Sequence, residues 1–212
     1  MKFIQHRVNT LQALCEVPRS CGAEIDIRYH RNDLVLHHDP FQHHETTPLL
    51  FEDFLQHWDK SGPLILNIKT EGIEERCIAL VTEHGVKDWF FLDLSMPYFV
   101  RYAAKAEKLE IPGFSPANLA VRFSEAEPIE YAAMFSCQAD WLWVDCFTKL
   151  PLTEGVIAQI RNLGFKICLV SPELQGHPVT EIKNFKNQLK DLGLEVEAVC
   201  TKTPAMWEHD SE

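Results

Sequence analysis

The residues of this sequence that could perform chemistry begin with Glu24 and Asp26, in the stretch GAEIDIR, and continue with His37, His38 and Asp39. Alternate residues of a β-strand point to the same side, so a strand here places both carboxylates on one face. Two carboxylates that face the same way repel each other unless a divalent cation or a basic side chain lies between them. An isolated E-x-D is more often the solvated face of an ordinary strand, so the rest of the chain decides between the two interpretations.

The length of 212 residues allows one large domain or two small ones, and 46% hydrophobic and 24% charged residues are typical of an ordinary globular protein. The chain is interpreted as a single domain, residues 1–212. The net charge of -11 argues against nonspecific nucleic-acid binding and against docking on an anionic membrane. It does not exclude an anionic small-molecule substrate, because a cluster of basic side chains can make a binding site positive even when the net charge of the protein is negative. The chain has no stretch of membrane-span or signal-peptide character, and its seven cysteines form no C-x-x-C pair. These features predict a cytoplasmic protein and leave its oligomeric state open.

Short β-rich runs alternate with helical patterns along the whole chain. The predicted strands are Phe3–His6, Ala23–Arg28, Leu64–Lys69, Trp89–Leu94, Leu119–Phe123, Trp141–Cys146, Lys166–Val170 and Glu197–Cys200. The predicted helices are Leu49–Trp58, Ile73–His84, Tyr98–Lys108, Pro128–Phe135, Thr153–Leu163 and Thr180–Leu192. This alternation predicts a compact, single-domain α/β fold, the (β/α)8 TIM barrel, with NDLVLHHDP as a short excursion after the second strand. An open doubly wound sheet is the alternative, but no G-x-G-x-x-G follows the first strand.

Nearly every predicted strand ends in polar residues, and active sites of such barrels gather at these strand ends. The polar residues are His6, Arg7, Glu24, Asp26, Arg28, Asn67, Lys69, Asp93, Arg122, Asp145, Ser171, Thr201 and Lys202. Any one of them is explained as a polar residue that ends an apolar strand. Together they predict that acidic and basic side chains line the carboxyl-terminal end of the barrel. Arg122 and Asp145 could hold a polar leaving group or form a structural ion pair. Trp141 and Trp143 are expected to pack between the strands and the helices.

In this order, the motifs resemble those of the glycerophosphodiester phosphodiesterases, relatives of the phosphatidylinositol-specific phospholipases C. That family has H-R-G followed by N-T, then G-A with E-x-D, V-x-x-H-D, E-x-K and T-D-x-P. The corresponding stretches of this chain are HRVNT at 6–10, GAEIDIR at 22–28, LVLHHDP at 34–40, LNIK at 66–69 and CTKTP at 200–204.

The resemblance implies a metal-dependent phosphodiesterase that hydrolyses a small phosphodiester. It assigns metal binding, of Mg²⁺ or Ca²⁺, to Glu24, Asp26 and Asn67. It assigns general acid and base catalysis to His6 and His38, and it assigns phosphate binding to Arg7 and Lys69. The attacking group is then a hydroxyl of the substrate or water, so no Ser or Cys nucleophile is required.

The sequence departs from the family pattern at four places. Val8 replaces the glycine of H-R-G, Asn67 replaces an acid, Lys202 replaces the aspartate of T-D-x-P, and LVSPEL replaces W-T-x-N after the seventh strand. These departures keep two alternatives open. One is a non-catalytic barrel that binds a phosphorylated metabolite without a metal, and the other is a metal-dependent isomerase or aldolase that uses Lys69. The histidines His30, His37, His43 and His44 are interpreted either as surface groups or as part of a zinc site.

Overall fold

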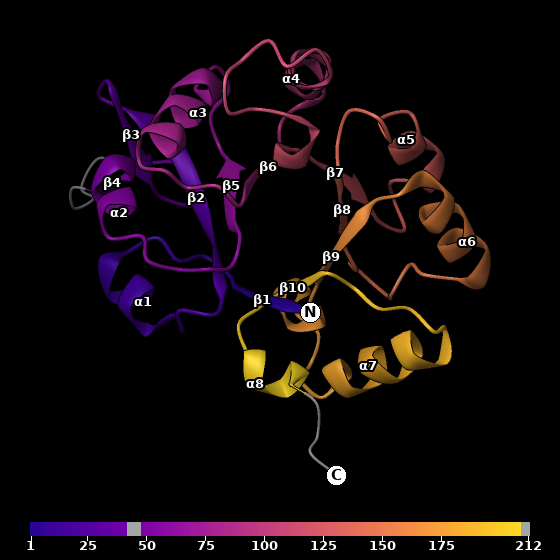
Figure 1. Cartoon of the computed structure of the whole chain (residues 1–212). Coiled ribbons are helices and arrows are strands. Elements are labelled where there is room, and N and C mark those ends of the chain that lie inside the picture. Colours follow the sequence, from indigo (N-terminus) through magenta and orange to yellow (C-terminus); the bar gives the residue numbers. More distant parts are fainter. Residues whose placement is uncertain (42–47, 209–212) are drawn as a thin grey trace.

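Eight parallel strands lie around a common centre in the computed structural model of this protein, which describes residues 1–41 and 48–208 (Figure 1). In these residues the strands are β1 (Lys2–Gln5), β2 (Gly22–His30), β5 (Leu64–Ile68), β6 (Trp89–Leu92), β7 (Ala120–Phe123), β8 (Trp141–Val144), β9 (Lys166–Val170) and β10 (Ala198–Thr201). A small antiparallel excursion, β3 (Asp33–Leu36) and β4 (Leu49–Leu50), pairs with the second half of β2. All eight predicted strands are present, and NDLVLHHDP forms the predicted excursion.

Helices surround the strands (Figure 1). They are α1 (Leu11–Glu16), α2 (Phe51–Gln56), α3 (Glu74–Glu83), α4 (Met96–Glu107), α5 (Ile129–Ala133), α6 (Glu154–Leu163), α7 (Glu181–Asp191) and α8 (Pro204–Trp207), with short 3-10 helices η1 (Pro116–Asn118) and η2 (Pro172–Gln175). Their sequences explain their limits. The Thr153 hydroxyl caps α6 by accepting a hydrogen bond from the amide of Val156, and α6 ends at Gly164, whose positive φ suits glycine. The six predicted helices are present, whereas the short helices α1 and α8 were not predicted.

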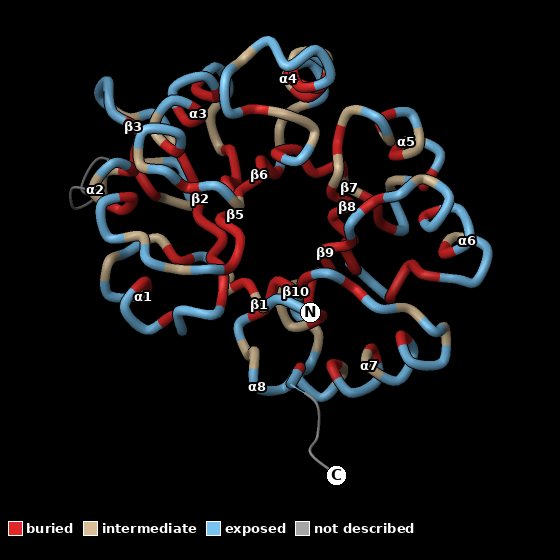
Figure 2. The backbone as a smooth tube through the Cα atoms, in the orientation of Figure 1, coloured by how far each residue is buried: buried red, intermediate tan, exposed pale blue. Residues whose placement is uncertain are grey.

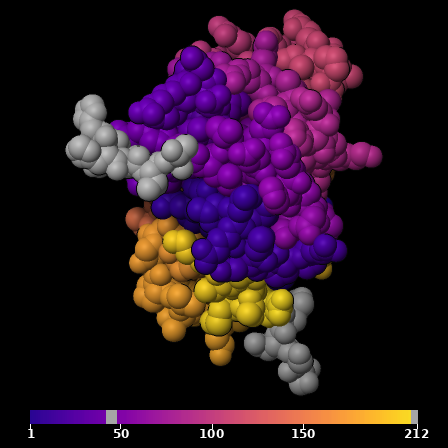
Figure 3. Space-filling model, turned by 90° about the vertical axis from the view of Figure 1, so that its left-hand side faces the viewer, coloured from indigo at the N-terminus to yellow at the C-terminus, as the bar shows by residue number. Residues whose placement is uncertain are grey.

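The strands are hydrogen-bonded in the order β6-β5-β2-β1-β10-β9-β8-β7, with all neighbours parallel. The first and last strands of the chain therefore pair with each other, and Figure 3 shows the N-terminal and C-terminal segments side by side. Between β6 and β7 the described residues form only an isolated bridge, Phe91 to Leu119. We call this junction the β6/β7 seam.

Side chains cross the β6/β7 seam at both ends. The Asn118 amide donates a 2.9 Å hydrogen bond to the carbonyl of Trp89, and Arg122 forms an ion pair with Asp93. The observed architecture is therefore a mixed α/β domain with a largely parallel sheet whose ladder is not closed at the seam. The strands follow one another in the order that a barrel predicts. The barrel prediction also requires a hydrogen-bonded ladder between β6 and β7, and in the described residues this ladder is absent.

The buried apolar side chains form two clusters on opposite faces of the strands. The larger cluster lies between the strands and the helices, and Figure 2 shows buried residues on the strands and on the inner sides of the helices. The smaller cluster consists almost entirely of strand residues. Trp141 and Trp143 belong to it, and Trp141 stacks on Phe90 with ring centres 4.8 Å apart. The expectation that these tryptophans pack against helices is therefore wrong.

Polar side chains continue the inner face of the strands toward their carboxyl ends. Ile4 and Ile65 belong to the smaller cluster, and two residues further along the chain stand His6, directly after β1, and Asn67 of β5. Because alternate residues share a face, this places both polar residues above the apolar interior.

Among the described residues, no helix has the length and apolar character needed to cross a membrane.

Candidate active site

The core of the candidate site is a group of three buried polar residues on β2 and β5. Glu24 is 1% exposed, Asp26 0% and Asn67 7%. Asp26 and Asn67 are register partners on adjacent parallel strands, and Oε1 of Glu24 accepts a 2.8 Å hydrogen bond from the Asn67 side-chain amide. Burial, together with the neighbouring Asp26 carboxylate, raises the pKa of Glu24 from 4.5 to about 7.

His6 follows β1 and lies beside this group, with its Nε2 3.8 Å from Oε2 of Glu24. Burial, together with the positive charges of Arg7, Lys202, His38 and Lys69, lowers the pKa of His6 from 6.5 to about 3. His6 is therefore a neutral imidazole at neutral pH, which makes it able to accept a proton. Its Nδ1 atom is buried and makes no hydrogen bond within the described residues.

Arg7 links the histidine of the excursion to the acids. Its backbone amide donates a 2.7 Å hydrogen bond to Oε2 of Glu24, and the positive φ of 55° turns the chain at this point. Its guanidinium lies 2.6 Å from Nε2 of His38. A guanidinium can only donate, so Nε2 accepts, and the His38 proton is assigned to Nδ1, which donates to Asp39 over 2.8 Å.

Lys69 completes the group from the end of β5. Its Nζ atom lies 3.4 Å from Oδ1 of Asp26 and 3.7 Å from Oδ2 of Asp93. The positive group beside the paired carboxylates is thus a lysine in this structure. The seven residues that the sequence selects for the site, His6, Arg7, Glu24, Asp26, His38, Asn67 and Lys69, gather at neighbouring strand ends through these contacts.

The donor set also fits a hard divalent cation. Oδ1 of Asp26 and Oδ1 of Asn67 are buried acceptor atoms to which no described residue donates a hydrogen bond. Carboxylate and amide oxygens are the ligands that Mg²⁺ and Ca²⁺ prefer, and a cation would relieve the repulsion that raises the pKa of Glu24. Within the described part of the chain, no three His, Cys, Asp or Glu side chains gather as a metal site, and a cation held here would take the amide oxygen of Asn67 as a ligand beside the two carboxylates.

Two residues that hold the site in place escaped the sequence analysis as contributors. Asn9 clamps Asp26: its Oδ1 accepts from the Asp26 amide at 2.9 Å, and its Nδ2 donates to Oδ2 of Asp26 at 2.8 Å. Arg28 donates to the carbonyl of His38 at 2.7 Å and to that of Lys69 at 3.3 Å. The N-T pair of the family motif was the available signal for Asn9, but the resemblance assigned no role to it.

The departures from the family motifs have structural explanations. Val8 is 1% exposed and its side chain packs in the larger apolar cluster, so its Cβ is directed into the core. Near Lys202, Glu173 of η2 accepts hydrogen bonds from the Thr201 hydroxyl at 2.6 Å and from the Lys202 amide at 3.0 Å. An acid from the LVSPEL segment therefore orders the turn after β10, next to the strand end that carries His6.

The remaining polar residues at the mouth pair with each other. Arg122 donates to Oδ2 of Asp145 at 2.9 Å while it also contacts Asp93, so the structural ion pair is the interpretation that the contacts support.

His30 and His37 both lie against the ring of Phe41, with ring centres 4.1 and 4.7 Å away. His43 and His44 lie outside the described residues.

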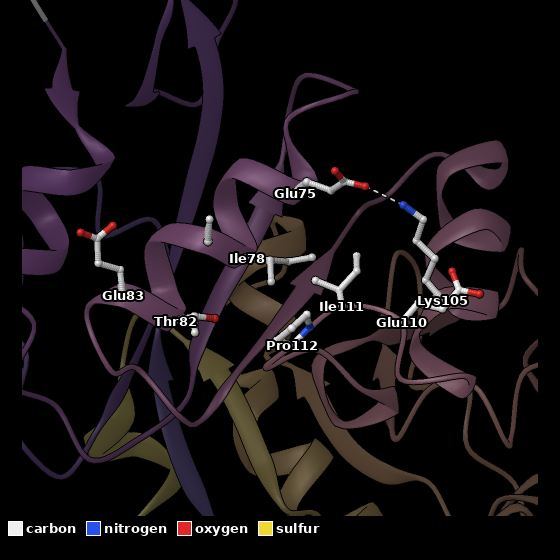
Figure 4. Close-up of a pocket in the computed structure, with 9 residues that line it drawn as sticks. Glu75, Ile78, Thr82, Glu83, Lys105, Glu110, Ile111 and Pro112 are labelled. Atoms are coloured by element: carbon white, nitrogen blue, oxygen red, sulfur yellow. Dashed lines mark hydrogen bonds and ion pairs between the residues drawn. The ribbon is translucent and has the colours of Figure 1, made fainter.

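A hollow of about 690 Å³ on the outer surface does not belong to the site. It lies between α3 and the segment after α4, where Ile78, Ile111 and Pro112 form its wall (Figure 4). Its lysine, Lys105, is paired with Glu75 at 2.5 Å. The hollow contains none of the residues that form the network around Glu24.

The sequence matches no protein-family model, and no curated protein matches it at a significant level. The fold, in contrast, matches solved structures. A glycerophosphodiester phosphodiesterase from Agrobacterium tumefaciens superposes with a TM-score of 0.65 at 15% identity, covering 98% of this chain and 99% of that one. A glycerophosphoryl diester phosphodiesterase from Parabacteroides distasonis gives 0.62 at 14% identity, with coverages of 97% and 84%. The chain therefore has, over nearly its whole length, the fold of glycerophosphodiester phosphodiesterases, the family that its motifs resemble.

Proposed function

We propose that the protein is a metal-dependent phosphodiesterase that hydrolyses a small phosphodiester, on a single (β/α)8 barrel domain that closes across the β6/β7 seam. The observation that carries the proposal is the connected network of side chains around Glu24. His6, Arg7 and Asn67 contact this carboxylate directly. With His38, which Arg7 contacts, residues from four separate stretches of the sequence meet at one place, and this combination of acidic, basic and imidazole groups supports phosphoryl chemistry.

Each residue has a role that follows from its surroundings. Glu24, Asp26 and Asn67 would hold the Mg²⁺ or Ca²⁺ ion, which supplies positive charge for the oxygens at phosphorus. His6 is neutral and accepts the proton of the attacking hydroxyl or water. Arg7 and Lys69 bind the phosphate oxygens.

His38 is the general acid in this proposal. Asp39 accepts its Nδ1 proton, an arrangement that orients the ring and leaves Nε2 as the atom that exchanges a proton with the substrate. When the guanidinium of Arg7 turns to a phosphate, Nε2 of His38 is released, takes up a proton and can give it to the departing alkoxide. Substrate binding and activation of the acid are thereby coupled through one arginine.

A screen of glycerophosphodiesters, cyclic phosphates and a chromogenic diester, with Mg²⁺, Ca²⁺ or a chelator, tests the proposal. Turnover that needs metal and disappears in Glu24→Ala is the expected result, and His38→Ala should abolish turnover of the diesters with alkyl leaving groups. Turnover that survives both substitutions would belong to a contaminant and would remove the support for this site.

One observation favours a second candidate, a barrel that binds a phosphorylated metabolite without a metal. Asp26 already has Lys69 as a partner, and Glu24 already accepts from Asn67. Calorimetry with glycerol phosphate, with and without a chelator, separates the two. Binding that is indifferent to chelator, combined with no turnover of any diester, would favour the binding protein.

A further inference from the structure

A hollow of about 640 Å³ opens directly beside His38. It lies between the start of α1, the end of β3 and the segment that leads through β4 into α2. Asn9 and His38, both members of the site network, are among its lining residues. The volume is in the range of small-molecule sites in proteins.

Much of the remaining lining of the hollow is apolar. Four leucines from three different elements line it: Leu11, Leu36, Leu49 and Leu50. Leu36 is 2% exposed and is part of the larger apolar cluster, so this wall is anchored in the core. Apart from the histidines, Asp53 is the one ionisable side chain among the described residues that line the hollow.

The position of the hollow relative to the chemistry decides what it can hold. A general acid must lie within hydrogen-bond reach of the oxygen that it protonates, so the leaving alcohol departs next to Nε2 of His38. The hollow begins at that same residue, whereas the hollow beside α3 in Figure 4 contacts no member of the site. A group attached to the leaving oxygen therefore extends toward the leucines.

We propose that this hollow is the subsite for the leaving alcohol and that the substrate is a phosphodiester whose leaving alcohol carries an alkyl or aryl group. The inference rests on the proposed phosphodiesterase function, because that function assigns the leaving group to His38. It adds the chemical class of the substrate, which neither the motifs nor the fold specify.

A series of glycerophosphate esters with methyl, butyl and octyl leaving alcohols tests the subsite, with the choline ester as a cationic comparison. We expect kcat/KM to rise with chain length, by roughly two- to fourfold for each methylene that enters the hollow. Leu50→Trp fills the hollow and lowers the octyl-to-methyl ratio at least tenfold on the same scale. Met134→Trp, at a residue that is 75% exposed and outside the site, leaves the ratio unchanged. A flat series, or a preference for choline over octyl, overturns the proposal.

Binding measurements separate this inference from the proposed activity. Calorimetry compares n-octyl phosphate, below its micelle concentration, with methyl phosphate on the wild type and on Leu50→Trp. If no diester is hydrolysed but octyl phosphate binds more tightly and Leu50→Trp removes the difference, the subsite stands and the phosphodiesterase proposal fails. Equal binding of the two phosphates overturns the subsite whatever the activity.

Discussion

Asn67 donates a hydrogen bond of 2.8 Å to the buried carboxylate of Glu24 on the neighbouring strand. The amide thus does two things at once. Its N–H group stabilises an acid that burial disfavours, and its Oδ1 atom remains a buried acceptor without a donor among the described residues. An acid at this position would provide a further negative charge but no hydrogen bond to Glu24.

Replacing Asn67 by Glu should make the protein more dependent on metal. Without metal, the lost hydrogen bond and the added repulsion should lower the free energy of unfolding by about 2–4 kcal/mol. With Mg²⁺ or Ca²⁺, the third carboxylate should raise metal affinity about tenfold or more. Denaturation with and without chelator measures both effects. Asn67→Leu is the control, because it removes the hydrogen bond without adding a charge, and an equal response of the two variants to metal would contradict the prediction.

The stability of the metal-free protein should depend on pH through two opposing groups. The folded-state pKa of Glu24 is raised from 4.5 to about 7, so the folded protein binds more protons than the unfolded chain in this window. Its contribution therefore falls as the pH rises from about 4.5 to 7. The folded-state pKa of His6 is lowered from 6.5 to about 3, so its contribution rises with pH between about 3 and 6.5.

The two trends overlap between pH 4.5 and 6.5 and should largely cancel in the wild type. Glu24→Gln should reveal stability that increases with pH, and His6→Asn should reveal stability that decreases with pH, each by a few kcal/mol across its window on the scale of about 1.4 kcal/mol per pKa unit. Urea denaturation at several pH values in chelator gives the slopes. Identical slopes in both variants would show that the two groups do not titrate in these directions.

Asn9→Ala should free the carboxylate of Asp26 from its clamp. We expect divalent-metal affinity to fall about tenfold, because the carboxylate loses the rotamer that leaves Oδ1 exposed to a ligand. Metal titration followed by calorimetry is the measurement. The control is Thr10→Ala, which removes the N-cap of α1 and costs about 1 kcal/mol of stability. If both variants lose metal affinity equally, the effect is one of general stability and Asn9 is not a positioning residue.

Removal of the His38 imidazole should slow hydrolysis by about 10²–10⁴-fold for alkyl leaving groups. The loss should be much smaller for 4-nitrophenolate, because this leaving group departs without a proton. Asp39→Asn should show the same pattern more weakly, since it removes the carboxylate that accepts from Nδ1. A comparison of kcat/KM across leaving groups of different basicity tests this. A uniform loss for all leaving groups would assign His38 to phosphate binding instead.

Strand ends predict that polar side chains such as Glu24, Asp26 and Asn67 gather at one edge, because the carboxyl ends of neighbouring parallel strands meet there. The family resemblance, and not the strand geometry, selects the seven candidate site residues and their roles, including His38 of the excursion. Asn9 is different. Its role depends on how the turn after β1 lies against β2, and a loop conformation carries no periodic signal in the sequence.

The placement of Trp141 and Trp143 shows a second limit. Strands of a parallel sheet are buried on both faces, so no polar alternation tells which face is the inner one. Alternation predicts that the two tryptophans share a face, which is correct. The space available on the inner face accounts for the side on which the tryptophans lie. Ala120, on the strand β7 between β6 and β8, belongs to the same inner cluster, and its small side chain leaves room for Phe90 to stack on Trp141.

The β6/β7 seam divides the molecule into two contiguous halves of four parallel strands, one built from β1, β2, β5 and β6 and the other from β7 to β10. In the part of the chain that the structure describes, the pairing of β1 with β10 alone joins the halves through a continuous ladder. Amide protons of β6 and β7 that face the seam should therefore exchange with solvent deuterium sooner than those at the β1–β10 junction. For the same reason, a protein split in the loop between α4 and η1 should reassemble from two separately expressed fragments.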